Sequence, residues 1–194
     1  MCIPKIIDLM NNKKLKIGLI LNTKRSFADW EIRLISKILE SNSCIIKLII
    51  CENKENEKKS DKIQILNIFN RGLNFLIRLI EKKFTKKILR KEENILKKKL
   101  SKIKKLRVNL IKKKYSDYFL DKDIKLIKSF KLDFIFRRDL RIIRGKILQS
   151  TKYGIWSLHH GDNDYYRGIP PGFWETYFDE NITGVTLQKL NNNL

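Results

Sequence analysis

Residues 14–21 read KLKIGLIL, and this short apolar run decides how the fold begins. A run of this length that starts at lysines and ends at a polar turn is typical of a buried strand. Apolar side chains then recur at helical spacing over residues 30–39, and Ser26 is placed to cap this helix with Asp29 at its third position. A second apolar run, CIIKLII at residues 44–50, predicts another buried strand. Together these segments predict a β-α-β unit, which starts a doubly wound sheet.

A Lys-rich stretch follows, from residue 52 to residue 114. Its first part, residues 52–62, is polar and mixed in charge, whereas Leu and Ile recur at helical intervals from Ile63 to Lys113. We therefore expect helix in this second part. We interpret the whole stretch as a basic helical insertion with solvated lysines, in preference to a helix that binds RNA or lies on a membrane surface.

The second half of the chain returns to alternating helices and strands. The expected elements are a helix at 121–130, a strand at 132–136, a short helical connection at 142–148, and strands at 153–159 and 183–190. The fold class predicted is therefore α/β, with a mostly parallel, Rossmann-like sheet, flanking helices and the Lys-rich helical insertion. We expect residues 1–194 to form a single domain, in which 52–114 is the insertion.

The composition limits the class of protein. A chain of 194 residues suits one domain, and its net charge of +22 is far from that of a neutral enzyme. A basic surface attracts anionic partners such as tRNA, nucleotide sugars and polyglutamylated folate. The charge comes mainly from Lys in a sequence that is also crowded with Ile and Asn, a combination that codon bias alone can produce. It therefore indicates nucleic-acid binding only weakly.

The cysteines and the apolar runs indicate the compartment. Cys2, Cys44 and Cys51 have neither paired nor metal-ligand spacing, which indicates free thiols in a reducing compartment and no zinc site. The longest apolar runs fall short of the roughly 20 residues that span a bilayer. The start of the chain has no apolar segment of the signal-peptide kind. We therefore expect a cytoplasmic protein with no membrane partner.

The only two histidines are adjacent, His159 and His160, where the strand predicted at 153–159 ends. Ligands of parallel α/β sheets collect at the carboxyl ends of the strands, and a loop rich in Gly, Asp, Asn and Tyr follows here. Spacing alone leaves three interpretations open. The histidines are catalytic, or they bind a metal together with a nearby Asp, or they are packed structural side chains.

Three motifs in this part of the chain occur in a fixed succession. They are Gly154 to His159 (GIWSLH), Tyr166-Arg167-Gly168 after a variable loop, and Thr183 to Thr186 (TGVT). This succession resembles the folate-dependent formyltransferase domain, whose members include methionyl-tRNA, glycinamide ribonucleotide and sugar-nucleotide N-formyltransferases. The resemblance is strong over residues 132–190 and weak over the opening β-α-β unit. It implies transfer of a formyl group from 10-formyltetrahydrofolate to an amine acceptor, which is an amino sugar or an aminoacyl group.

Position by position, the resemblance implies roles for individual residues. His159 matches the catalytic His of the family, and Ser157 stands where the family has Asn. The resemblance implies that His159 donates to the oxyanion or moves a proton, and that Ser157 donates from its hydroxyl. Arg141 and Ile142 match the loop whose backbone meets the pterin ring of the cofactor. Asp162, close to His159 in sequence, is a further candidate for the cofactor site and for a substitute carboxylate.

The sequence departs from the family pattern at two positions. Leu140 occupies a position that is often Gly, which is expected to narrow the pocket. The family's catalytic Asp follows the Thr-Gly-Val-Thr strand, and counted from Thr186 its position falls beyond Leu194. We therefore expect an incomplete active site, and both an active and an inactive formyltransferase-like protein stay open.

Other classes of function stay open. The chain is alternatively a non-catalytic remnant of the family, or a basic nucleic-acid-binding module in which Tyr165, Tyr166, Phe173 and Trp174 stack on bases beside Arg167. We favour Phe173 and Trp174 as core residues of a helix that packs on the sheet. Nothing in the sequence resembles the tRNA-holding C-terminal domain of methionyl-tRNA formyltransferases. A small-molecule acceptor such as a sugar nucleotide is therefore expected, and tRNA is the less favoured partner.

Overall fold

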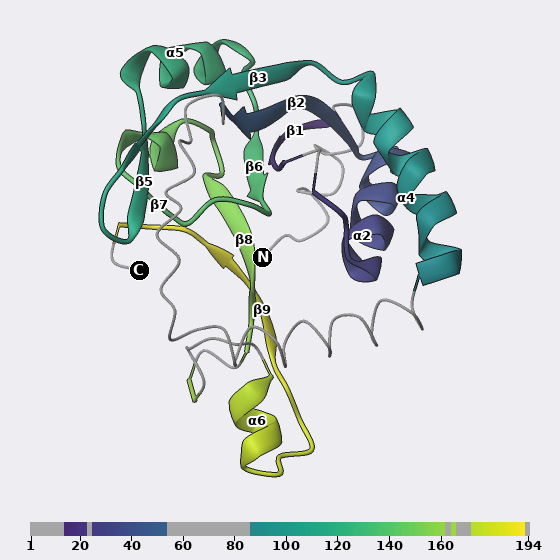
Figure 1. Cartoon of the computed structure of the whole chain (residues 1–194). Helices are drawn as coiled ribbons and strands as arrows, with labels where there is room; N and C mark the ends of the chain where they lie inside the picture. The colour runs from purple at the N-terminus through teal and green to yellow at the C-terminus, as the bar shows by residue number, and fades with distance from the viewer. Residues whose placement is uncertain (1–13, 23–24, 54–85, 162–163, 166–171, 193–194) are drawn as a thin grey trace, which may run out of the picture. The chain divides into compact units, whose positions relative to one another are not determined.

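The computed structural model describes residues 14–22, 25–53, 86–161, 164–165 and 172–192 (Figure 1). The described chain divides into two compact units. The first contains the described residues of 1–22, 41–53 and 103–194, and the second contains those of 23–40 and 54–102. The predicted linker at 52–62, most of the predicted helix up to residue 85, and Asp162 lie outside the described residues.

A six-stranded sheet forms the frame of the first unit. Its strand order is β3-β2-β1-β6-β8-β9, and every neighbouring pair is parallel except β8 and β9. The strands are β1 (Leu15–Ile20), β2 (Cys44–Glu52), β3 (Lys105–Val108), β6 (Phe134–Arg137), β8 (Ile155–His160) and β9 (Val185–Lys189). The prediction of an α/β fold with a mostly parallel sheet is confirmed at this level.

A smaller sheet in the same unit has the order β4-β5-β7. Its strands are β4 (Leu110–Lys112), β5 (Ser116–Phe119) and β7 (Ile142–Arg144). The pair β4 and β5 is an antiparallel hairpin, whereas β5 and β7 are parallel. The small sheet therefore brings the segment before α5 next to the loop that follows β6.

The core of the first unit joins the two sheets to one helix and one 3-10 helix. Helix α5 (Asp121–Ser129) buries Ile124 and Ile127 at i, i+3 spacing, and the 3-10 helix η2 (Lys146–Gln149) buries Ile147. These side chains belong to one apolar cluster with β1, β2, β6 and β8. Removal of each such side chain from water contributes about 1.5–3 kcal/mol, which is the main force that holds the sheets together.

The second unit contains α2 (Asp29–Glu40) and α4 (Lys86–Ser101). Glu31, at the third position of α2, reaches back to the backbone N–H of Ala28 at 2.7 Å, so that Ala28 occupies the cap position. The predicted cap at Ser26 is therefore wrong by two residues. The two helices are linked by an ion pair of 3.2 Å between Lys99 and Glu40.

Two further expectations are corrected by the structure. Residues 105–112 form β3 and β4 instead of continuing the predicted helix, because Leu106 and Val108 alternate with exposed cations and fit an edge strand beside β2. The predicted helical connection at 142–148 begins as β7, since its apolar start pairs with β5, and becomes 3-10 helix only after Gly145. Among the described residues no helix has the length and apolar character needed to cross a membrane.

Candidate functional site

The candidate site lies at the carboxyl edge of the parallel sheet. One row of paired residues crosses three parallel strands there and continues onto β9: Ile20, Arg137, Ser157 and Gln188. His159 follows Ser157 by two residues in β8 and pairs with Thr186. Because strand side chains alternate between faces, Ser157 and His159 lie on one face of β8 and His160 lies on the other. The structure thus brings the two predicted catalytic residues together.

Ser157 is buried, with 3% of its surface exposed. Its hydroxyl accepts a hydrogen bond of 3.2 Å from Arg137 Nη1 and donates one of 3.3 Å to the carbonyl oxygen of Leu158. A buried hydroxyl that makes both bonds is held in one rotamer. Ser157 is therefore a fixed polar group, whose one O–H is already donated to Leu158 and one of whose two lone pairs accepts from Arg137.

Arg137 ends β6 and was not predicted as a site residue. Its Nη2 donates a hydrogen bond of 2.5 Å to the carbonyl oxygen of Leu140, while its Nε is buried and has no partner among the described residues. Burial lowers the pKa of the Arg137 guanidinium from its ordinary value, and the negative charges of Asp117 and Asp139 act in the opposite direction. The position of this Arg at the end of the apolar run FIFR is the feature of the sequence from which it could have been recognised as a candidate.

His159 is half-buried, and its Nε2 atom is buried without a hydrogen-bond partner in the described part of the chain. A ring nitrogen in this state donates to or accepts from a bound ligand once the ligand comes within reach. Of the two histidines, only His159 shares a face with Ser157. The pairing of β8 with β6 therefore places His159, and not His160, on the face that carries Ser157 and Arg137.

Arg141 lies in the loop between β6 and β7 and is held by Asp117. The Asp117 carboxylate accepts hydrogen bonds from the Arg141 backbone N–H at 3.1 Å, from Nε at 3.0 Å and from Nη2 at 2.7 Å. Asp117 is buried in β5, whereas 44% of the Arg141 side chain is exposed. Ile142 begins β7 and is exposed. The backbone N–H of Arg141 is therefore engaged within the protein.

A second ion pair orders the end of β6. Arg138 and Asp139 form a buried pair of 3.1 Å, and Asp139 also accepts a hydrogen bond of 2.7 Å from the backbone N–H of Asn22, which follows β1. Leu140 comes next, with a φ of 78°, in the left-handed region that Gly adopts without cost. This loop is thus strained and fixed at the edge where β1 and β6 end.

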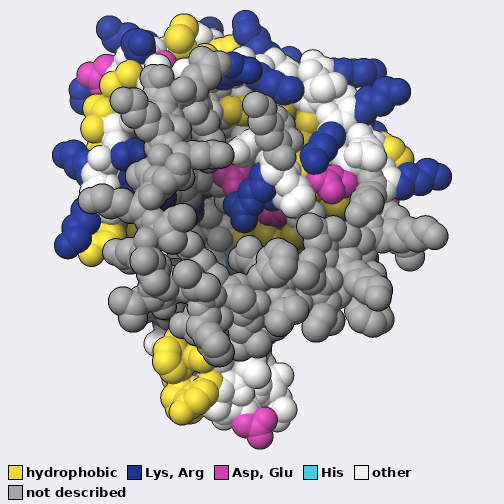
Figure 2. Space-filling model, in the orientation of Figure 1, with side chains coloured by type: hydrophobic (Ala, Val, Ile, Leu, Met, Phe, Trp, Pro, Cys, Tyr) yellow, Lys and Arg dark blue, Asp and Glu magenta, His cyan; other side chains and the backbone are white. Residues whose placement is uncertain are grey.

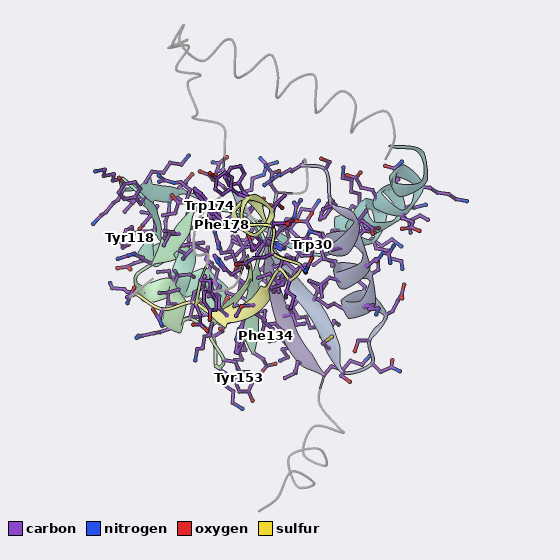
Figure 3. All side chains as sticks on the ribbon, turned by 90° about the horizontal axis from the view of Figure 1, so that it is seen from below. Trp30, Tyr118, Phe134, Tyr153, Trp174 and Phe178 are labelled. Atoms are coloured by element: carbon purple, nitrogen blue, oxygen red, sulfur yellow. The ribbon has the colours of Figure 1, made fainter. Side chains whose placement is uncertain are left out.

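The aromatic residues of α6 (Phe173–Tyr177) do not belong to the core. Phe173 is 47% exposed and Trp174 is 40% exposed, so our interpretation of both as core residues is wrong. The helix buries Glu175 instead, whose carboxylate accepts a hydrogen bond of 3.1 Å from Thr183 Oγ1. Figure 2 shows hydrophobic side chains gathered where Figure 1 places α6, and Figure 3 shows Trp174 beside Phe178.

A pocket of about 380 Å³ opens elsewhere in the first unit. It lies at the amino end of β8, and its lining includes Gly154, Lys152 and Lys189 but none of the candidate site residues. Among the described side chains, no group of three or more His, Cys, Asp or Glu is placed to hold a metal ion. The pocket is therefore separate from the candidate site at the carboxyl edge.

The predicted site residues thus separate into groups. Ser157 and His159 share one face of β8, Arg141 lies in the loop between β6 and β7, Ile142 begins β7, and Asp162 lies outside the described residues. Sequence reasoning assigned no role to Arg137 or Asp117, whose partners Ser157 and Arg141 lie 20 and 24 positions away in the chain. In comparisons with known protein families and with curated proteins, nothing matches this chain.

Proposed function

We propose that the chain is a formyltransferase-like protein, which takes a formyl group from 10-formyltetrahydrofolate and transfers it to an amine. The observation that supports this most is the placement of His159 and Ser157 on one face of β8, at the carboxyl edge of a parallel sheet. The unpartnered Nε2 of His159 provides the donor or acceptor that this chemistry needs.

The order of the strands supports a Rossmann-like version of the α/β fold. From β1 the chain adds β2 and β3 on one side, then returns to add β6 and β8 on the other side. In doubly wound folds the ligand site lies where the order reverses, outside the carboxyl ends of the strands. Here that position is between β1 and β6, next to Asn22, Arg137 and the Asp139 loop. The proposed helical insertion ends before β3, because β3 is itself a strand of the main sheet.

The reaction proposed has simple physical requirements. The amine nitrogen attacks the formyl carbon, a negative charge develops on the formyl oxygen, and the bond from carbon to the folate nitrogen then breaks while a proton moves from the amine to that nitrogen. His159 is the group proposed to donate to the oxygen or to move the proton. Arg141 and Ile142 are the proposed cofactor-loop residues, and an amino sugar carried on a nucleotide is the favoured acceptor.

The test uses the full chain and a stable 10-formyltetrahydrofolate analogue in calorimetry, together with a formyl-transfer assay on amino-sugar nucleotides. His159→Ala is expected to lower the transfer rate by about 10²–10⁴, the range of a lost general acid or base. His160→Ala is the matched control, because this side chain lies on the opposite face of β8. Equal rates in the wild type and in both variants would contradict the assignment of His159, and no saturable binding of the analogue would remove the folate proposal.

A second candidate function is supported by the exposure of the α6 aromatics. Phe173 and Trp174 lie on the surface of a basic chain, as do the stacking groups of proteins that bind single-stranded nucleic acid. Each lost stacking contact is expected to cost about 1–3 kcal/mol of binding free energy. Fluorescence titration of a single-stranded RNA with Trp174→Ala tests this, and Trp30→Ala, an exposed Trp on α2, is the control. Unchanged affinity would exclude α6 as the platform.

A further inference from the structure

Three arginines from the end of β6 and the loop after it form a cluster with two carboxylates, one from this loop and one from β5. Arg138 pairs with Asp139 at 3.1 Å, and Arg141 pairs with Asp117 at 2.7 Å. Arg137, the third arginine, donates only to neutral oxygens, the hydroxyl of Ser157 and the carbonyl of Leu140. Three positive charges and two negative charges leave one positive charge without a carboxylate partner in this described cluster.

This remaining charge sits in a partly buried place. Desolvation disfavours the charged guanidinium of Arg137, and the attraction of Asp117 and Asp139 offsets it only in part, because burial is the largest cause of its lowered pKa. A buried cation without a carboxylate partner lowers stability, so a protein that keeps one commonly uses it for a ligand.

Two buried side-chain nitrogen atoms at this place are unused. Arg137 Nε and His159 Nε2 both lack a hydrogen-bond partner in the described chain. Arg137 pairs with Ser157 in the register of β6 and β8, and His159 is two residues further along β8 on the same face. The two side chains are thus diagonal neighbours on adjacent parallel strands, a separation that long side chains span.

We propose that Arg137 and His159 form a binding site for the anionic group of a small molecule, a carboxylate or a phosphate. The planar guanidinium suits two-point contact with such a group, and its bonds to Ser157 and Leu140 hold it in position. Both side chains keep some exposed surface, and binding requires a rotation of the His159 ring that turns its Nε2 toward the ligand. The inference concerns what binds, and it does not depend on formyl transfer.

A purely structural role for Arg137 explains less. The hydrogen bond from Arg137 Nη2 to the Leu140 carbonyl holds a backbone with a φ of 78°. A role in fixing this strained loop therefore explains the partner of Nη2. It does not account for the unpaired Nε, for the missing carboxylate partner or for the unpaired nitrogen of His159. An Arg137 that only fixed the loop would bind no anion, so anion binding distinguishes the two roles.

The experiment titrates the full chain with inorganic phosphate and, separately, with formate, by calorimetry at constant ionic strength in chloride. Arg137→Gln is compared with Lys125→Gln, which removes the same charge from the exposed face of α5. We expect at least one anion to bind at a single saturable site, with at least tenfold weaker affinity in Arg137→Gln and unchanged affinity in Lys125→Gln. Binding of phosphate alone indicates a phosphorylated ligand, and binding of formate alone indicates a carboxylate.

A second measurement covers the case in which Arg137→Gln does not fold. In the wild-type chain, added anion is expected to shift the NMR signals of the His159 ring, assigned with His159→Gln, more than those of His160. The proposal is overturned if neither anion binds saturably to the folded wild type, if Arg137→Gln binds as tightly as the wild type, or if the His159 signals do not move when an anion binds.

Discussion

Arg137 Nη1 lies 3.2 Å from Ser157 Oγ and donates to it across the neighbouring parallel strands β6 and β8. This contact links a residue that the sequence suggested for catalysis to one that it did not single out. Ser157 therefore has a structural role, because its hydroxyl accepts from a partly buried cation and helps to hold it in place. The surroundings of His159 depend on both residues.

Ser157→Ala tests this contact. Removal of the hydroxyl leaves Arg137 Nη1 without its acceptor, and an unsatisfied buried donor costs about 1–3 kcal/mol of unfolding free energy. Urea denaturation followed by circular dichroism measures the loss. Ser129→Ala is the control, because it removes an exposed hydroxyl that only bonds the Leu126 carbonyl, and a change within about 0.5 kcal/mol is expected. Equal losses of unfolding free energy in both variants would show that the contact between Ser157 and Arg137 does not stabilise the fold.

Asp117→Asn tests the anchoring of the loop that carries Arg141. The buried carboxylate accepts three hydrogen bonds from Arg141, but water screens the exposed part of that side chain, so we expect a loss of about 1–3 kcal/mol. Urea denaturation gives this value. Asp179→Asn, which changes an exposed carboxylate in the same way, should leave the midpoint unchanged. If the Asp117→Asn variant were as stable as the wild type, the charge of Asp117 would not be required to anchor the loop.

Gly18→Ala tests the packing of β1 on the core. A Cβ at this position would lie 2.7 Å from Leu132 Cδ1 and 3.0 Å from Ile135 Cγ1, so the added methyl overpacks the core by about 1–3 kcal/mol. The register of β1 and β2 also shifts at this glycine. Adding Leu132→Ala should relieve part of the clash, which makes the two changes less than additive in a double-mutant cycle. Strict additivity would argue against contact between these two positions.

The stabilisation that the Asp121 carboxylate contributes depends on pH, and one substitution is expected to reduce this dependence. The carboxylate accepts a hydrogen bond of 2.8 Å from Lys146 Nζ, and this bond and the Lys146 charge hold the pKa of Asp121 below its ordinary value. For a carboxyl with a lowered folded pKa, the stabilisation is present above the unfolded pKa and is lost as the pH falls through the folded pKa.

We expect Lys146→Met to raise the pKa of Asp121 toward its ordinary value, as measured by the ¹³C carboxyl shift during an acid titration. Lys125→Met is the control and should change this pKa less, because Lys125 contributes only a weaker charge effect. An unchanged Asp121 titration in Lys146→Met would rule out the pair in solution.

Several elements could be predicted from the pattern of apolar residues. The run at 14–21 contains β1, the run at 44–50 lies within β2, and the spacing after Asp121 matches α5. The secondary structure of the Lys-rich region was harder to predict, because lysines fit both the period of a helix and the period of a strand. The alternation at Leu106 and Val108 distinguishes β3 from helix only when β2 is available to pair with it. The exposure of Phe173 and Trp174 could not be predicted, since apolar residues alone do not reveal which face a short helix buries.

By itself, the sequence determined the α/β alternation and the position of His159 and Ser157 on one face of a strand, because a strand's period of two is local. Only the tertiary structure decided which side chains meet them. Arg137 and Ser157 are separated by 20 positions in the chain, and Asp117 and Arg141 by 24. Their contacts follow from the order and register of β5, β6, β7 and β8, and pairing between distant strands is set by the packing of the whole core.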